Sequence, residues 1–89
     1  MSVRQNAERS RFELDVEGET AFLNYRLNGS EMLLTHTETP AALRGRGIGE
    51  RVVLGTLEQA RAQKLHVRPL CSFVRHVMAQ HPQFSDLLA

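Results

Sequence analysis

Near its middle the chain carries the stretch Leu43-Arg44-Gly45-Arg46-Gly47-Ile48-Gly49-Glu50. Its glycines occupy alternate positions, and glycine adopts positive φ without steric cost, which lets backbone N–H groups converge on one point. The segment from Ile48 onward has the apolar period of a helix, and a helix start presents unpaired N–H groups and the positive end of its dipole. The stretch therefore predicts an anion-binding loop with phosphate as its ligand.

The loop differs from the two best-known phosphate-binding signatures. A P-loop ends in Gly-Lys-Ser/Thr, whereas this stretch ends in Gly49-Glu50-Arg51. The dinucleotide fingerprint spaces its glycines as G-x-G-x-x-G, and the spacing here is G-x-G-x-G. Arg44 and Arg46 supply forked donors that suit phosphate oxygens. A flexible glycine-rich turn with solvated arginines is the alternative that the sequence leaves open.

Length and composition limit the class of protein. A chain of 89 residues forms one small domain, and 42% hydrophobic with 24% charged residues is ordinary for a globular protein. The net charge of +1 gives no general attraction to nucleic acid, and an aromatic stacking platform is missing. Apolar runs fall far short of the roughly twenty residues that cross a bilayer. With no signal-peptide core and the single Cys71, we expect a cytoplasmic protein without a membrane or nucleic-acid partner.

Before the loop, the sequence predicts an antiparallel β-meander. Alternating apolar and polar residues indicate three strands, at 11–16, 20–27 and 31–39. Asn28-Gly29 favours a tight hairpin because both residues tolerate positive φ. The residues before this pattern, 1–10, are polar, and we expect them to form a flexible N-terminus.

After the loop, the sequence predicts a helix over 47–64, a short strand over 65–70 and a second helix over 72–80 with Ser72 as its N-cap. The strand follows a helical crossover, so it should pair in parallel with the third strand. The predicted fold class is α+β (mixed α/β), with an antiparallel meander followed by a βαβα unit in a single domain spanning 11–89.

Three residues are candidates for catalysis. Cys71 lies where the last strand meets the second helix, so helix-start amides could lower its pKa; an inert core cysteine is the alternative. The alternation of the third strand places His36 and Glu38 on the same face as Met32 and Leu34, just before the loop. There they could act as a general base and its partner, or form only a surface polar pair. The histidines lack a recognised ligand spacing, so we expect no metal site.

Three blocks of the sequence resemble the small GNAT-like N-acetyltransferase domain proteins, a truncated branch of the GNAT acetyltransferase superfamily. The blocks are His36-Thr37-Glu38 with Pro40, then Arg44-Gly45-Arg46-Gly47-Ile48-Gly49, then Pro69-x-Cys71-Ser72-Phe73-Val74. Arg44, Gly47 and Gly49 match the Q/R-x-x-G-x-G/A signature whose amides bind the pyrophosphate of acetyl-coenzyme A in that superfamily. The resemblance spans roughly residues 11–88. It implies a GNAT-like fold without the usual N-terminal helices, and a cysteine at position 71 proposed to act in catalysis.

The resemblance thus implies an acetyl-coenzyme A-dependent N-acyltransferase that acts on an unidentified amine, either directly or through Cys71. Backbone amides around 46–49 should hold the pyrophosphate, and the nearby arginines should meet phosphate oxygens. The expected cofactor-binding residues are Arg44, Gly45, Arg46, Gly47, Ile48, Gly49 and Arg51. The alternative is a coenzyme A-binding module with a regulatory or protein-interaction role and little catalysis. The acceptor and the oligomeric state do not follow from the sequence.

Overall fold

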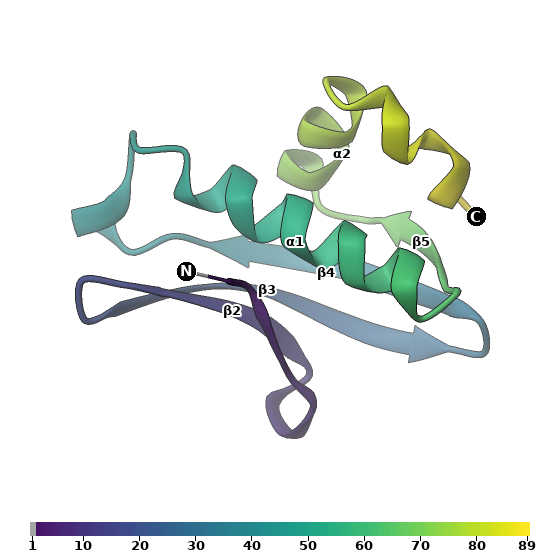
Figure 1. The fold of residues 1–89 in the computed structure, drawn as a ribbon, viewed down its shortest axis with the longest axis horizontal. Coiled ribbons are helices and arrows are strands. Elements are labelled where there is room, and N and C mark those ends of the chain that lie inside the picture. Colours follow the sequence, from purple (N-terminus) through teal and green to yellow (C-terminus); the bar gives the residue numbers. More distant parts are fainter. Residues whose placement is uncertain (1) are drawn as a thin grey trace.

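The computed structural model describes residues 2–89, which form one five-stranded mixed sheet with two α-helices (Figure 1). The strands are β1 (Arg4–Asn6), β2 (Arg11–Val16), β3 (Glu19–Asn28), β4 (Glu31–Glu38) and β5 (His66–Pro69). The α-helices are α1 (Ile48–Ala62) and α2 (Ser72–Ala79). Short 3₁₀ turns are η1 (Ala7–Arg9), η2 (Ala41–Leu43) and η3 (Pro82–Leu87).

The topology confirms the predicted fold class. The sheet order follows the chain from β1 to β5, with antiparallel pairs up to β4 and β5 parallel to β4. The parallel pair needs a crossover, and α1 supplies it across the front of β3 and β4 (Figure 1). No helix among residues 2–89 has the length and apolar character needed to cross a membrane.

The face of the sheet that packs against α1 and α2, termed the inner face, holds the core. It carries the apolar set predicted from strand alternation, for example Phe12, Leu23 and Leu34, all fully buried. The apolar stripe of α1, including Val53 and Leu57, closes over it. The opposite, outer face carries polar and charged side chains, so the sheet has the one-sided burial typical of antiparallel meanders.

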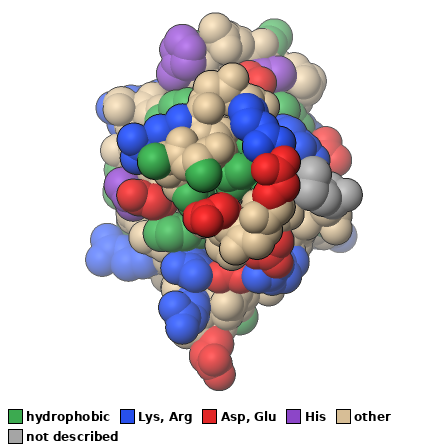
Figure 2. Space-filling view, turned by 90° about the vertical axis from the view of Figure 1, so that its left-hand side faces the viewer, with side chains coloured by type: hydrophobic (Ala, Val, Ile, Leu, Met, Phe, Trp, Pro, Cys, Tyr) green, Lys and Arg blue, Asp and Glu red, His purple; other side chains and the backbone are tan. Residues whose placement is uncertain are grey.

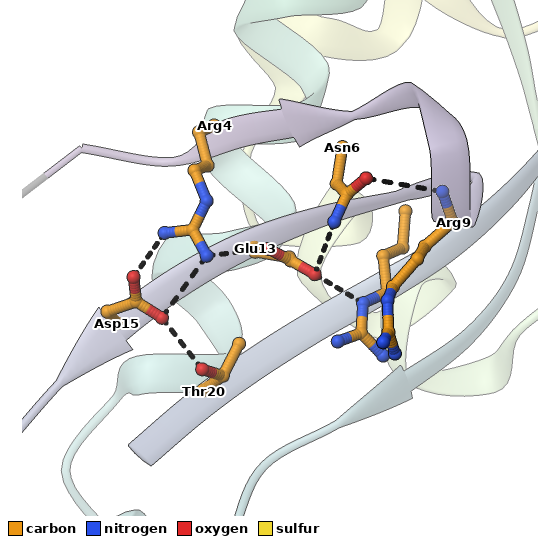
Figure 3. A network of polar contacts seen from close by, with 7 residues as sticks. Arg4, Asn6, Arg9, Glu13, Asp15 and Thr20 are labelled. Carbon is orange, nitrogen blue, oxygen red and sulfur yellow. Dashed lines mark hydrogen bonds and ion pairs between the residues drawn. The ribbon is translucent and has the colours of Figure 1, made fainter. Parts of the chain in front are cut away.

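Residues 4–9 differ from the expected flexible segment 1–10, of which Met1 lies outside the described residues. Arg4 and Asn6 pair across to β2 and direct their side chains to Glu13, whose carboxylate is only 2% exposed (Figure 3). Arg4 also contacts Asp15, and Arg11 donates to Glu13 at 2.5 Å. The polar residues that suggested disorder therefore form an edge strand held by ion pairs.

A β-bulge in β4 overturns the expected placement of His36 and Glu38. Leu34 lies opposite Tyr25 and His36 lies opposite Asn24, so Thr35 is an extra residue in β4. Because strand side chains alternate, this one residue reverses the faces that follow it. His36 and Glu38 lie on the outer face, and Thr37, opposite Leu23, lies on the inner face.

Candidate functional site

The glycine loop, residues 44–49, joins η2 to α1, and its backbone requires glycine at two positions. Gly45 has φ +79° and Gly47 has φ +73°, values that side-chain-bearing residues rarely adopt. Gly47 is the N-cap of α1. A Cβ at either glycine would meet no atom within 4 Å, so conformation rather than space demands glycine there. The open space leaves the loop amides and the first turn of α1 accessible to a ligand.

Gly49 is required for a different reason. A Cβ there would lie 3.0 Å from Thr39 Oγ1 and 3.2 Å from the Phe73 ring. Its missing side chain lets the first turn of α1 approach both the end of β4 and the start of α2. The three alternate glycines therefore have two different roles. Gly45 and Gly47 let the loop bend, and Gly49 lets the first turn of α1 pack closely against the end of β4 and the start of α2.

A cavity of about 350 Å³ lies between the glycine loop and α2. Its lining is Thr39, Leu43, Arg44, Gly45, Gly47, Ile48, Gly49, Glu50, Phe73, His76, Val77 and Gln80. Five of the expected cofactor-binding residues are in this set, and Arg46 and Arg51 are not. The residues of α2 were not predicted as part of the site. Their spacing of 73, 76, 77 and 80 is that of one helix face, which was the available signal.

The three arginines near the loop have different surroundings. Arg44 donates from Nε to the carbonyl of Thr39 at 3.1 Å and forms no ion pair within residues 2–89, so the rest of its guanidinium is available at the cavity. Arg46 forms two contacts to Glu17, Nη1–Oε1 at 3.2 Å and Nη2–Oε2 at 2.6 Å. Arg51 is exposed on α1 outside the cavity lining. Arg44 is therefore the arginine that faces a cavity ligand.

Cys71 is the N-cap of α2, the position that the sequence suggested for Ser72. It is half-buried on the inner side, and its Sγ lies 3.9 Å from Thr37 Oγ1. Burial raises the pKa of the Cys71 thiol, but the nearby backbone amides of Val74 and Phe73 and the Thr37 hydroxyl lower it further than burial raises it. The net pKa lies below the ordinary thiol value of 9.0, so the surroundings stabilise the thiolate relative to an ordinary cysteine.

His36 and Glu38 form a contact with each other on the outer face, His36 Nε2 to Glu38 Oε2 at 2.6 Å. Their side chains are 57% and 47% exposed. Neither lines the cavity beside the glycine loop. The structure thus joins these two residues as expected but separates them from Cys71 by the thickness of the sheet.

The edge of β4 opens beside Cys71. β5 pairs with β4 only as far as Leu34 opposite Pro69. The amides of Leu70 and Cys71 then both donate to the Leu34 carbonyl, at 2.9 and 3.2 Å, as the chain turns into α2. In the part of the chain that the structure describes, residues 35–38 of β4 have no strand partner on this side. An extended ligand could use this free backbone edge.

Comparison with known proteins identifies the family and the fold. The sequence pattern of the family described as GCN5-related N-acetyl-transferase matches residues 11–87. The fold is similar to the NMR solution structure of a GCN5-like protein from Staphylococcus aureus, proposed to be an N-acetyltransferase. That likeness has a TM-score of 0.74 at 25% sequence identity, over 99% of this chain and 87% of the other. No curated protein matches the chain in sequence. Residues 2–89 contain no group of three or more His, Cys, Asp and Glu side chains that could hold a metal ion.

Proposed function

The chain belongs to the GCN5-related N-acetyltransferase family, and we propose that it transfers an acetyl group from the thioester of coenzyme A to an amine. The observation that carries this proposal is the cavity between the glycine loop and α2, which has a phosphate-type loop on one side and, on the other, the helix whose N-cap is Cys71. Cys71 itself lies outside the cavity lining. The loop would bind the anionic end of coenzyme A, and the thiol of Cys71 would react with its acetyl end.

The residues of the cavity fit coenzyme A. The positive-φ glycines leave the loop backbone uncovered, and the start of α1 adds N–H donors and the favourable end of its dipole for a diphosphate. Arg44 supplies a guanidinium that no carboxylate neutralises within residues 2–89. The free edge of residues 35–38 offers backbone hydrogen bonds to the amides of a pantetheine arm. Arg46 and Arg51 have a weaker claim to phosphate contact, because both lie outside the cavity.

The surroundings of Cys71 favour a route through its thiol. Bound coenzyme A would supply the acetyl group as an activated thioester. The Cys71 thiolate attacks the acetyl carbonyl and retains the acetyl group on Sγ, while the coenzyme A sulfur leaves with the electron pair of the broken C–S bond. The amine then attacks this new thioester, losing a proton, and the Cys71 sulfur leaves. Amides at the start of α2 stabilise the thiolate both before and after the transfer.

Direct transfer to the amine is the second route, with His36 or Glu38 as the base. Their position on the outer face, across the sheet from the cavity and Cys71, weighs against this route. Both routes give the same overall reaction and differ in whether the enzyme becomes acetylated.

Intact-protein mass spectrometry after mixing with acetyl-coenzyme A tests the proposal. The thiol route predicts an acetyl adduct on the wild type, absent from Cys71→Ala and discharged when an amine panel is added. Direct transfer predicts acetylated amine without an adduct, retained in Cys71→Ala and lost in the double variant His36→Ala/Glu38→Ala. Binding of coenzyme A with neither adduct nor acetylated amine would contradict the enzyme and leave a coenzyme A-binding module.

A further inference from the structure

An ion pair connects the glycine loop to a part of the chain that is far away in the sequence. Arg46 reaches from the loop to Glu17 in the turn between β2 and β3, 29 residues earlier in the sequence, and makes two contacts to its carboxylate. In Figure 1 this loop and this turn lie at the same left-hand end of the molecule, and Figure 2 shows basic and acidic side chains interleaved there. The other side-chain contact from the loop, Arg44 to Thr39, is local.

Glu17 lies in a tight hairpin turn between β2 and β3. Glu17 and Gly18 have φ of +53° and +82°, the sign required at both positions of the tight hairpin turns that match strand twist. The turn is closed by the pair of Val16 with Glu19, and Val16 is 3% exposed. Glu17 therefore follows directly after a buried strand end, whereas residues 44–47 of the loop are all exposed.

The exposed glycine loop must be ordered before it can bind an anion tightly. Residues 44–47 contain both positive-φ glycines, and glycine has the largest conformational freedom to lose on ordering. Binding that must first order such a loop gives up affinity, and a contact that orders it in the free protein recovers that affinity. The Arg46 guanidinium holds the pKa of Glu17 below its ordinary value of 4.5, so the pair is charged at neutral pH.

We propose that Glu17 is a positioning residue for the cofactor: its ion pair with Arg46 holds the glycine loop in the conformation that directs the amides of residues 47–49 into the cavity. The inference rests on the proposed function, because coenzyme A is the anion for which the loop is positioned. It also changes the role of Arg46, which the sequence suggested as a phosphate ligand. Arg46 acts through Glu17, and Arg44 meets the ligand.

The direction in which Glu17→Gln changes the affinity for coenzyme A distinguishes a positioning role from competition with phosphate. A carboxylate that merely competed with phosphate for Arg46 would weaken cofactor binding, so Glu17→Gln would tighten it. A carboxylate that positions the loop has the reverse effect, and Glu17→Gln weakens binding although it removes a negative charge near an anion. Glu19→Gln is the matched control, since Glu19 is an exposed carboxylate at the same turn and forms no ion pair within residues 2–89.

Two measurements on the full chain test the inference. Calorimetric titration with coenzyme A should give binding about three-fold weaker in Glu17→Gln, the size expected for loss of an exposed pair, and no weaker in Glu19→Gln. Backbone ¹⁵N relaxation of the free protein should give lower order parameters at residues 45–49 in Glu17→Gln alone, with an unchanged urea midpoint. Unchanged or tighter binding in Glu17→Gln, or unchanged order parameters in the loop, would overturn the inference. A wild type that does not bind coenzyme A would contradict the proposed function, and the comparison of order parameters would still decide whether Glu17 orders the loop.

Discussion

The two faces of the sheet hold their polar groups in opposite ways. On the inner side, Cys71 lies beside Thr37, and the glycine loop lines a cavity beside α2. On the outer face, polar side chains pair with one another, such as Glu13 with Arg11 and His36 with Glu38. The comparison indicates that the polar groups still free to bind a ligand are concentrated on the inner side of the sheet.

The bulge at Thr35 creates this division within a single strand. It leaves Met32 and Leu34 in the core while turning Thr37 toward Cys71 and His36 toward solvent. Bulges often re-aim side chains next to functional sites. On the proposed function, the cofactor and the thiol lie on the inner side of β4, and His36 lies across the sheet from both.

Removing the buried charge of the outer face should have the largest effect on stability. Glu13 is 2% exposed, and Glu13→Ala leaves Arg11 without its carboxylate acceptor and Arg4 with Asp15 alone, so we expect a loss of about 2 kcal/mol in the free energy of unfolding. Glu38→Ala is the control on the same face, with an expected change below about 0.5 kcal/mol because Glu38 is exposed. Urea unfolding measures both, and equal losses would contradict a structural role specific to Glu13.

The same carboxylate should make stability fall in acid. Burial raises the pKa of Glu13, but Arg11, Asn6 and Arg4 lower it further than burial raises it, so the folded pKa lies below the ordinary 4.5. The contribution is therefore fully present above pH 4.5 and is lost as the pH falls through the lower folded value. We expect the stability difference between wild type and Glu13→Gln to shrink across this range. A constant difference from neutral pH downward would exclude linkage through Glu13.

On the inner side, the two arginines outside the Glu17 pair should differ. Arg44→Gln removes a charge-assisted donor from the cavity, and we expect coenzyme A to bind about ten-fold more weakly. Arg51→Gln removes the same charge from outside the cavity, with an expected change below about two-fold. Calorimetric titration at one salt concentration gives both values. Equal losses of affinity would mean that only the total positive charge near the start of α1 matters, and not the position of Arg44 at the cavity.

The smallest expected effect concerns the thiol. The rate of alkylation of Cys71 by iodoacetamide should rise with pH about a midpoint below 9.0, as its lowered pKa requires. Thr37→Val removes the hydroxyl 3.9 Å from Sγ and should move that midpoint upward, and Thr37→Ser should restore it. His36→Ala should leave the midpoint unchanged because His36 lies on the other face. A midpoint that follows His36 would break the separation of the two faces.

Most regular elements could be predicted from the sequence because their patterns are local. The meander, both helices and the parallel last strand follow from periodicity and the crossover rule. The strand at Arg4–Asn6 could not, because its stability comes from ion pairs with β2 rather than from an apolar face. The bulge at Thr35 could not either, since nothing in the alternation of β4 marks the extra residue, and it decides where His36 lies.

The candidate site was predictable as far as its backbone. Positive φ at Gly45 and Gly47 follows from glycine chemistry and the helix that comes next. The partner of Arg46 did not follow, because Glu17 approaches only when the hairpin and the loop are folded together. The contribution of α2 to the cavity depends on the close approach at Gly49, which a single sequence does not reveal.

Binding of coenzyme A to Gly47→Val, measured against Gly29→Val, tests the central claim most directly. Both glycines have positive φ, +73° and +61°, and a Cβ at either meets nothing within 4 Å, so both substitutions impose similar backbone strain. Only Gly47 belongs to the loop. We predict similar losses of thermal stability in the two variants, with the thermal shift caused by coenzyme A abolished in Gly47→Val and kept in Gly29→Val. A full shift in folded Gly47→Val would contradict the assignment of the glycine loop as the cofactor site.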